Sequence, residues 1–172
     1  MTEHIEFDDI ETLGAGAFGA PGGRTFLIQA RQRGQVLSVL LEKEQVRLLA
    51  KEVLQFLDRL DHDFPEPTGQ PWGLDGSISE AVPLFRARVL GIGYDPKRSL
   101  VVIELREWPD DEVPAEAGSE APEARVARIP ASRALVRTMA QCGLESVEAG
   151  RPNCQLCELP MDPAGHWCPR SN

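Results

Sequence analysis

Two segments of the chain carry a helical pattern of apolar positions. The first has six apolar residues at steps of three and four, with charged residues between them: Val46, Leu49, Ala50, Val53, Leu57 and Leu60. This spacing predicts an amphipathic helix of about five turns, and Glu42 and Glu44 lie near its positive end, where carboxylates are stabilising. The second pattern follows Pro130 and covers residues 135–147, with Ser132 as N-cap and 150–152 as a stop. We expect both apolar faces to be buried in the core.

Five further segments have the composition of β-strands and are bounded by turn-forming residues: 24–30, 36–41, 84–94, 99–106 and 125–129. The first two form a predicted hairpin, and the next two form a second one. Residues 24–60 and 84–147 thus share an order of strand pair then helix, and both helices contain a Val-Arg pair, at 46–47 and 136–137. We predict an α+β fold with a two-layer, mostly antiparallel sheet of about five strands, packed on one face by two helices.

Charged residues alternate along the second predicted hairpin at Arg86, Arg88, Glu104 and Arg106. This alternation predicts a solvated sheet face with charged cross-strand pairs, and a functional basic patch is the alternative interpretation.

Two connections contain no regular pattern. Residues 61–83 are rich in proline and glycine, which predicts a long surface connection pinned by Phe64 and Trp72. Residues 109–124 hold six acidic and no basic side chains, which predicts a flexible loop. We therefore expect an α+β domain over 1–150 and a separate small module over 151–172.

The charge balance limits the classes of partner. The net charge is −9, and residues 109–124 supply six of those negative charges, so the rest of the chain is only mildly acidic. This balance makes nucleic acid an unlikely main partner but leaves room for a local basic patch. No apolar run approaches the roughly 20 residues of a membrane-spanning helix, and the acidic start does not match a signal peptide. We expect a soluble, cytoplasmic protein with no membrane contact.

A glycine-rich string near the start has two interpretations. Gly14, Gly16 and Gly19 match G-x-G-x-x-G, but a strand rather than a helix follows, so a dinucleotide fold is not indicated. A structural glycine-proline loop is the favoured interpretation. The alternative is a phosphate-binding loop formed by the three glycines together with Arg24.

The last residues carry the most specific motif of the sequence. Cys154 and Cys157 have the spacing of a zinc knuckle, and His166 and Cys168 follow after turn-forming residues. Four protein ligands close a tetrahedral shell and leave no position for an activated water, which favours a structural over a catalytic zinc ion. His166 as a bystander, or cysteines that are simply free thiols, are the alternatives. The remaining cysteine, Cys142, falls on the apolar side of the second predicted helix and is interpreted as a core residue.

Several of these segments together resemble the uncharacterised bacterial domain-of-unknown-function 3090 family. The similarity lies in 21–30, 40–46, 83–86 with 90–94, and the tail from Cys154 to 172, and it covers nearly the whole chain. The resemblance implies no established activity.

The leading functional hypothesis is a non-enzymatic adaptor whose zinc-held tail and acidic loop bind another protein. No nucleophile–base motif is recognisable, since His4 and His62 are isolated, yet the sequence leaves enzymatic activity undecided. The alternative is an enzyme or binding protein for a phosphorylated small molecule or nucleotide, through Arg24 or the Arg86/Arg88 pair. Nucleic-acid binding through the knuckle ranks below both.

Overall fold

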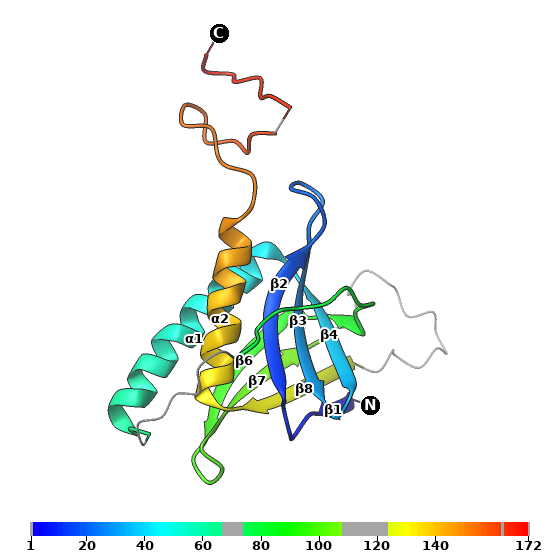
Figure 1. The fold of residues 1–172 in the computed structure, drawn as a ribbon, viewed down its shortest axis with the longest axis vertical. Helices are drawn as coiled ribbons and strands as arrows, with labels where there is room; N and C mark the ends of the chain where they lie inside the picture. The colour runs from blue at the N-terminus through cyan, green and yellow to red at the C-terminus, as the bar shows by residue number, and fades with distance from the viewer. Residues whose placement is uncertain (1, 67–73, 108–123, 163, 172) are drawn as a thin grey trace, which may run out of the picture.

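The structure is a computed structural model that describes residues 2–66, 74–107, 124–162 and 164–171. In chain order its elements are β1 (Thr2–Glu6), β2 (Thr12–Phe18), β3 (Thr25–Gln32), β4 (Gln35–Leu41), α1 (Lys43–Asp63), β5 (Phe85–Arg86), β6 (Val89–Asp95), β7 (Leu100–Arg106), β8 (Ala124–Ala131) and α2 (Arg133–Glu148). The α+β class and the two helices agree with the sequence-based prediction. The helices lie side by side and antiparallel on one side of the strands (Figure 1).

The strands form two four-stranded sheets, where the sequence pattern predicted one sheet of about five. The first sheet has the order β2-β3-β4-β5 and the second has the order β1-β8-β7-β6. Both are mixed, because β5 pairs in parallel with β4 and β1 pairs in parallel with β8. The predicted strand 84–94 is in fact two strands, since the Ala87 N–H donates to Leu40 in the first sheet and the Arg88 N–H donates to Arg106 in the second. The chain passes from one sheet to the other between these two residues.

The two halves of the chain have the same topology. Each half consists of a short strand, an antiparallel three-stranded meander and a helix, and each short strand pairs with the last meander strand of the other half. The symmetry predicted for 24–60 and 84–147 therefore extends to β1 and β2. The registers place β2 and β6 at equivalent positions, where their sequences are Leu13-Gly-Ala-Gly-Ala17 and Leu90-Gly-Ile-Gly-Tyr94.

The position of β2 corrects the interpretation of the glycine string as a loop. Gly14 and Gly16 lie inside β2, and only Gly19, at φ 97°, belongs to the turn that follows. A Cβ on Gly14 would stand 2.2 Å from the carbonyl oxygen of Gly76, and one on Gly16 would meet Ile78 and Ser146. The first two glycines are needed because a neighbouring segment and α2 approach the backbone closely.

One continuous core joins both sheets and both helices. Every apolar position predicted for α1 is buried, and in α2 the buried set includes Leu135, Val136, Met139 and Val147. The predicted N-cap of α2 is present, since the Leu135 N–H donates to the Ser132 hydroxyl. Cys142 is half-buried against Gly76, and burial raises the pKa of its thiol, in line with a packing role.

Charged cross-strand pairing occurs on the second sheet. Glu104 of β7 accepts hydrogen bonds from Arg106 and from Arg128 of β8. Arg86 is not part of this face, because it lies in β5 and pairs with Glu42. Trp72 and the acidic segment lie outside the described residues, except for Ala124, which begins β8.

Candidate functional site

The tail after α2 begins with a tight turn that carries two of the predicted metal ligands. Asn153 and Pro160 form an antiparallel bridge, and within it the Cys154 N–H donates to Leu159 and the Glu158 N–H donates back to Cys154. Glu158 adopts φ 62°, which bends the chain directly after Cys157. This turn places the side chains of Cys154 and Cys157 on the same side, as a metal knuckle requires.

The second pair of ligands returns to the knuckle through another bend. Asp162 and Gly165 form an isolated bridge, Gly165 has φ 123°, and His166 and Cys168 follow. The ligand atoms of all four residues lie within 4.8 Å of one another, with Cys154 and Cys168 buried. The structure therefore brings together every predicted metal ligand.

Two distances between ligand atoms of this Cys3His cluster can be compared with a tetrahedral metal site. The sulfurs of Cys154 and Cys168 are 3.8 Å apart, which matches the edge of about 3.8 Å expected for a tetrahedron with metal–sulfur bonds of about 2.3 Å. Cys157 Sγ and His166 Nε2 are 3.1 Å apart, a few tenths of an ångström closer than the corresponding sulfur–nitrogen edge.

The thiols of the knuckle are electrostatically unequal. Backbone hydrogen bonds from Cys157 and Leu156, together with the neighbouring thiols, lower the pKa of Cys154 to about 6. Burial and the adjacent sulfurs of Cys154 and Cys168 raise the pKa of Cys157. Cys154 therefore ionises more readily than Cys157, and a thiolate is the form that binds a metal ion.

Two arginines hold the tail in this conformation. Arg170 donates to the carbonyl oxygen of Leu156 at 2.9 Å, which ties the last residues to the knuckle. Arg151 forms an ion pair with Asp162, which ties the start of the tail to its second bend. Each contact thus joins two parts of the tail that are separated in the sequence by residues of the Cys3His cluster.

The large apolar side chains of the tail face solvent. Leu156, Leu159 and Trp167 are 54%, 50% and 72% exposed, whereas the buried residues of the tail are cysteines that belong to the cluster. The tail extends beyond the end of α2, away from the main body of the sheets (Figure 1). Among the described residues of the tail, the buried side chains thus belong to the Cys3His cluster, whereas three large apolar side chains lie at the surface among polar ones.

The predicted phosphate-binding residues are only partly brought together. Arg24 and Arg86 line one cavity of about 470 Å³, while Arg88 lies outside it. Gly14 and Gly16 are covered by packing, as described above, and are not among the lining residues. Sequence reasoning did not identify Lys43 and Arg151 as members of this cavity. The lack of a shared local motif explains this, because the lining residues come from four separate segments.

Among the residues that the structure describes, neither helix combines the length and apolar character that crossing a bilayer requires.

Comparison with known proteins gives one result. No curated protein and no solved structure matches the chain significantly. The family model described as "Protein of unknown function (DUF3090)" matches residues 5–168, which is nearly the whole chain and includes all four residues of the Cys3His cluster. The chain therefore belongs to the DUF3090 family.

Proposed function

We propose that the protein is an adaptor that binds another protein through its C-terminal tail, and that a structural zinc ion held by Cys154, Cys157, His166 and Cys168 shapes this tail. The observation that carries the proposal is the burial pattern of the tail. The Cys3His cluster occupies its interior, whereas the apolar side chains of Leu156, Leu159 and Trp167 are exposed to solvent. A segment this short cannot build a hydrophobic core, and a metal ion supplies the missing free energy of folding.

The choice of zinc follows from the donor set. Three sulfurs and one imidazole with tetrahedral spacing are typical of structural zinc sites, and four protein ligands leave no open coordination position. Three thiolates and a neutral imidazole give the site a charge of −1, and two arginines, Arg151 and Arg170, flank the ligands in the sequence. The closed shell supports a structural role and gives no support to metal catalysis in the tail.

Exposed aromatic and aliphatic side chains on a rigid support are typical of protein-binding surfaces. Trp167 is the most exposed of the three, and aromatic residues of this kind often dominate binding energy. Because the zinc ion would fix the tail before binding, little conformational entropy would be lost on association. We therefore assign Trp167 as the main anchor, with Leu156 and Leu159 around it.

A capture experiment in the native host tests the proposal. The tagged full-length protein and its Trp167→Ala variant are compared by cross-linking and quantitative mass spectrometry, and each partner found is then purified and its Kd measured. Leu48→Ala is the matched control, because Leu48 is 60% exposed on α1 and far from the tail in sequence. We expect one partner to bind wild type and Leu48→Ala equally, and to bind Trp167→Ala at least about 30-fold more weakly, which is about 2 kcal/mol.

Two results would contradict this function. The first is the absence of any specific partner for the wild-type chain. The second is a partner whose Kd is the same for wild type, Trp167→Ala and protein from which the metal has been chelated, since binding would then not depend on the tail.

A further inference from the structure

A cavity of about 470 Å³ lies where the turn between β2 and β3 meets the start of α1 and the start of the tail. Its size falls within the range of small-molecule sites. Four basic residues and one acidic residue line it: Arg24, Lys43, Arg86, Arg151 and Glu42. Phe26, Leu40 and Pro83 provide apolar wall beside these charges.

Two of the cations in this cavity have no carboxylate partner among the described residues. Arg86 pairs with Glu42, and Arg151 pairs with Asp162, whereas Arg24 and Lys43 form no ion pair there. Arg24 contacts the ring of Phe26, and its Nη1 is buried without a hydrogen-bond acceptor. A buried guanidinium nitrogen without an acceptor is costly, so an acceptor from outside the chain would be strongly favoured.

The unpaired cations are also close neighbours. A Cβ built on Gly150 would stand 3.2 Å from Lys43 Nζ and 3.7 Å from Arg24 Nη1, so both groups approach the same point at the end of α2. Like charges at such a separation repel each other, and an anion between them would convert this repulsion into attraction. The glycine keeps the space between them open.

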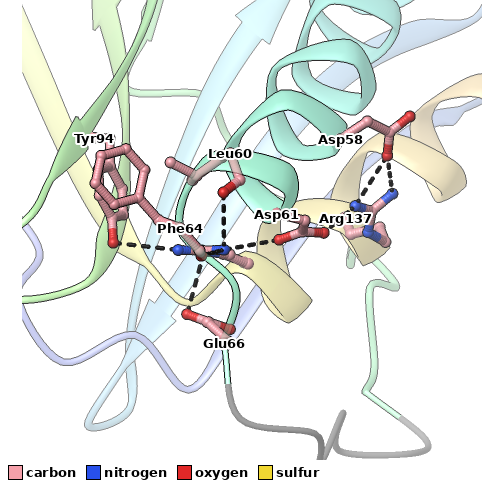
Figure 2. A network of polar contacts seen from close by, with 8 residues as sticks. Asp58, Leu60, Asp61, Phe64, Glu66, Tyr94 and Arg137 are labelled. Atoms are coloured by element: carbon pink, nitrogen blue, oxygen red, sulfur yellow. Dashed lines mark hydrogen bonds and ion pairs between the residues drawn. The ribbon is translucent and has the colours of Figure 1, made fainter.

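The other half of the molecule contains an equivalent place that is filled by its own side chains. Arg133 is the first residue of α2, as Lys43 is of α1, and it is only 5% exposed. It donates to Asp61 at 2.8 Å, to the Phe64 carbonyl at 2.6 Å and to the Tyr94 hydroxyl at 3.2 Å. Figure 2 shows Asp61, Phe64, Glu66 and Tyr94 gathered around one guanidinium group at the end of α1.

The two places differ in the residue that could neutralise the basic side chain and in the residue that could occupy the space beside it. Asp61 lies eighteen positions after the first residue of α1, and the residue at the same distance in α2 and its extension is Arg151. Strand register makes Ala17 of β2 the equivalent of Tyr94 in β6. A guanidinium thus stands where the other half has a carboxylate, and a methyl group stands where it has a large ring. The cavity therefore lacks the acidic partner of the filled half and has excess positive charge.

We propose that this cavity binds the phosphate monoester of a small organic molecule, with Arg24, Lys43 and Arg151 around the phosphate and the organic group against the apolar wall. Two unpaired cations match the charge of about −2 that a phosphate monoester carries near pH 7. The cavity is larger than a phosphate ion alone needs, and Phe26 and Pro83 suit an apolar substituent. This inference goes beyond the proposed adaptor function and does not depend on it.

Isothermal titration calorimetry of the zinc-loaded full chain with phenyl phosphate, at low ionic strength, tests the proposal. We expect a Kd of about 1 mM or tighter, with inorganic phosphate at least about tenfold weaker because it lacks the apolar contact. Lys43→Gln is expected to weaken binding about tenfold or more. Lys51→Gln is the matched control, because Lys51 is an exposed lysine of α1 that lies outside the cavity.

A second variant imitates the filled half. Arg151→Asp places a carboxylate at the position equivalent to Asp61, where it would pair with Lys43 and compete with the ligand. We expect it to abolish binding while the far-UV circular dichroism spectrum stays unchanged. Zinc content is measured in the same sample, because Arg151 also pairs with Asp162 of the tail.

Three results would overturn the proposal. The first is that phenyl phosphate does not bind the wild-type chain. The second is that it binds wild type, Lys43→Gln and folded Arg151→Asp with equal affinity. The third is that the wild-type chain binds phenyl phosphate and inorganic phosphate with equal affinity. The last result would exclude the organic ester as the ligand class.

Discussion

Replacement of Arg133 by methionine tests how the two halves of the protein are joined. The guanidinium donates to two backbone carbonyls and to Asp61 of the opposite helix end, contacts Glu66 at 3.2 Å, and lies over the ring of Tyr94. Methionine keeps the length of the apolar stem but removes every donor, so most of the lost energy reports on the polar network, with a smaller contribution from the volume of the missing guanidinium group.

The expected cost can be estimated from the burial of the partners. Removal of one member of a buried ion pair costs about 3–5 kcal/mol. Because Asp61 and Glu66 are 42% and 47% exposed, water can solvate them in the variant, and we take the lower end of that range. Arg133→Met should therefore lower the free energy of unfolding by about 3 kcal/mol. With a urea m-value of about 2 kcal/mol/M, the midpoint should fall by about 1.5 M.

The assay is urea unfolding of zinc-loaded protein at pH 7, followed by far-UV circular dichroism. Arg137→Met is the control, because Arg137 lies one turn further along α2, is more exposed, and pairs with Asp58 and Asp61 at the surface. Its expected cost is about 1 kcal/mol or less. A cost for Arg133→Met that is no larger than that of Arg137→Met would refute the reasoning.

Three further outcomes follow from particular contacts. Gly14→Ala places a Cβ against the Gly76 carbonyl and should lower the free energy of unfolding by about 2 kcal/mol, measured by urea unfolding. The control Gly93→Ala adds a Cβ with nothing within 4 Å and should change it little. Equal losses would contradict the packing role of Gly14. Although burial raises the pKa of Glu104, hydrogen bonds from two arginines lower it below its usual value. The carboxylate therefore stabilises the fold above the unfolded pKa, and this stability is lost as pH falls through the folded pKa. At pH 7 the free energy of unfolding of wild type should exceed that of Glu104→Gln by about 1 kcal/mol. This difference should shrink as the pH falls below about 4. A difference in urea midpoints that stays constant across that range would be evidence against the pairing. Chelation of the tail metal should weaken phenyl phosphate binding measured by calorimetry, because Arg151 lines the cavity from the tail; unchanged affinity would separate the two sites.

Features set by local sequence were predictable. The α1 helix runs from Lys43 to Asp63, as its apolar spacing and acidic start indicated, and the spacing of Cys154, Cys157, His166 and Cys168 identified the whole cluster. Both depend on residues close together in the chain, where period and ligand spacing are direct consequences of geometry.

The two-sheet arrangement was not predictable in the same way. The strand β1 pairs with β8 across most of the chain, and β5 has only two residues, so neither has a local signal strong enough to reveal its partner. The centre of β2, residues 14–17, consists of glycine and alanine, which are poor indicators of a strand. These small residues are needed there because the backbone packs tightly against its neighbours. The shared Leu-Gly-x-Gly sequence of β2 and β6 was the signal that could have revealed it.

The basic cavity also required the fold. Arg24, Lys43 and Arg151 belong to a turn, a helix start and the tail, and the packing of α2 against both α1 and β2 brings them together. The burial of Arg133 was hidden for the same reason, because an arginine at the start of a helix is usually solvated.

X-ray absorption spectroscopy at the zinc edge, with metal analysis of the same sample, tests the central claim most directly. We predict one zinc ion per chain, with three sulfurs at about 2.3 Å, one nitrogen at about 2.0 Å and no bound water. The Cys168→Ser variant should lose one sulfur from the shell or lose the metal. A zinc content far below one per chain, or a shell with fewer than three sulfurs in the wild-type protein, would contradict the assignment of Cys154, Cys157, His166 and Cys168 as a closed structural site.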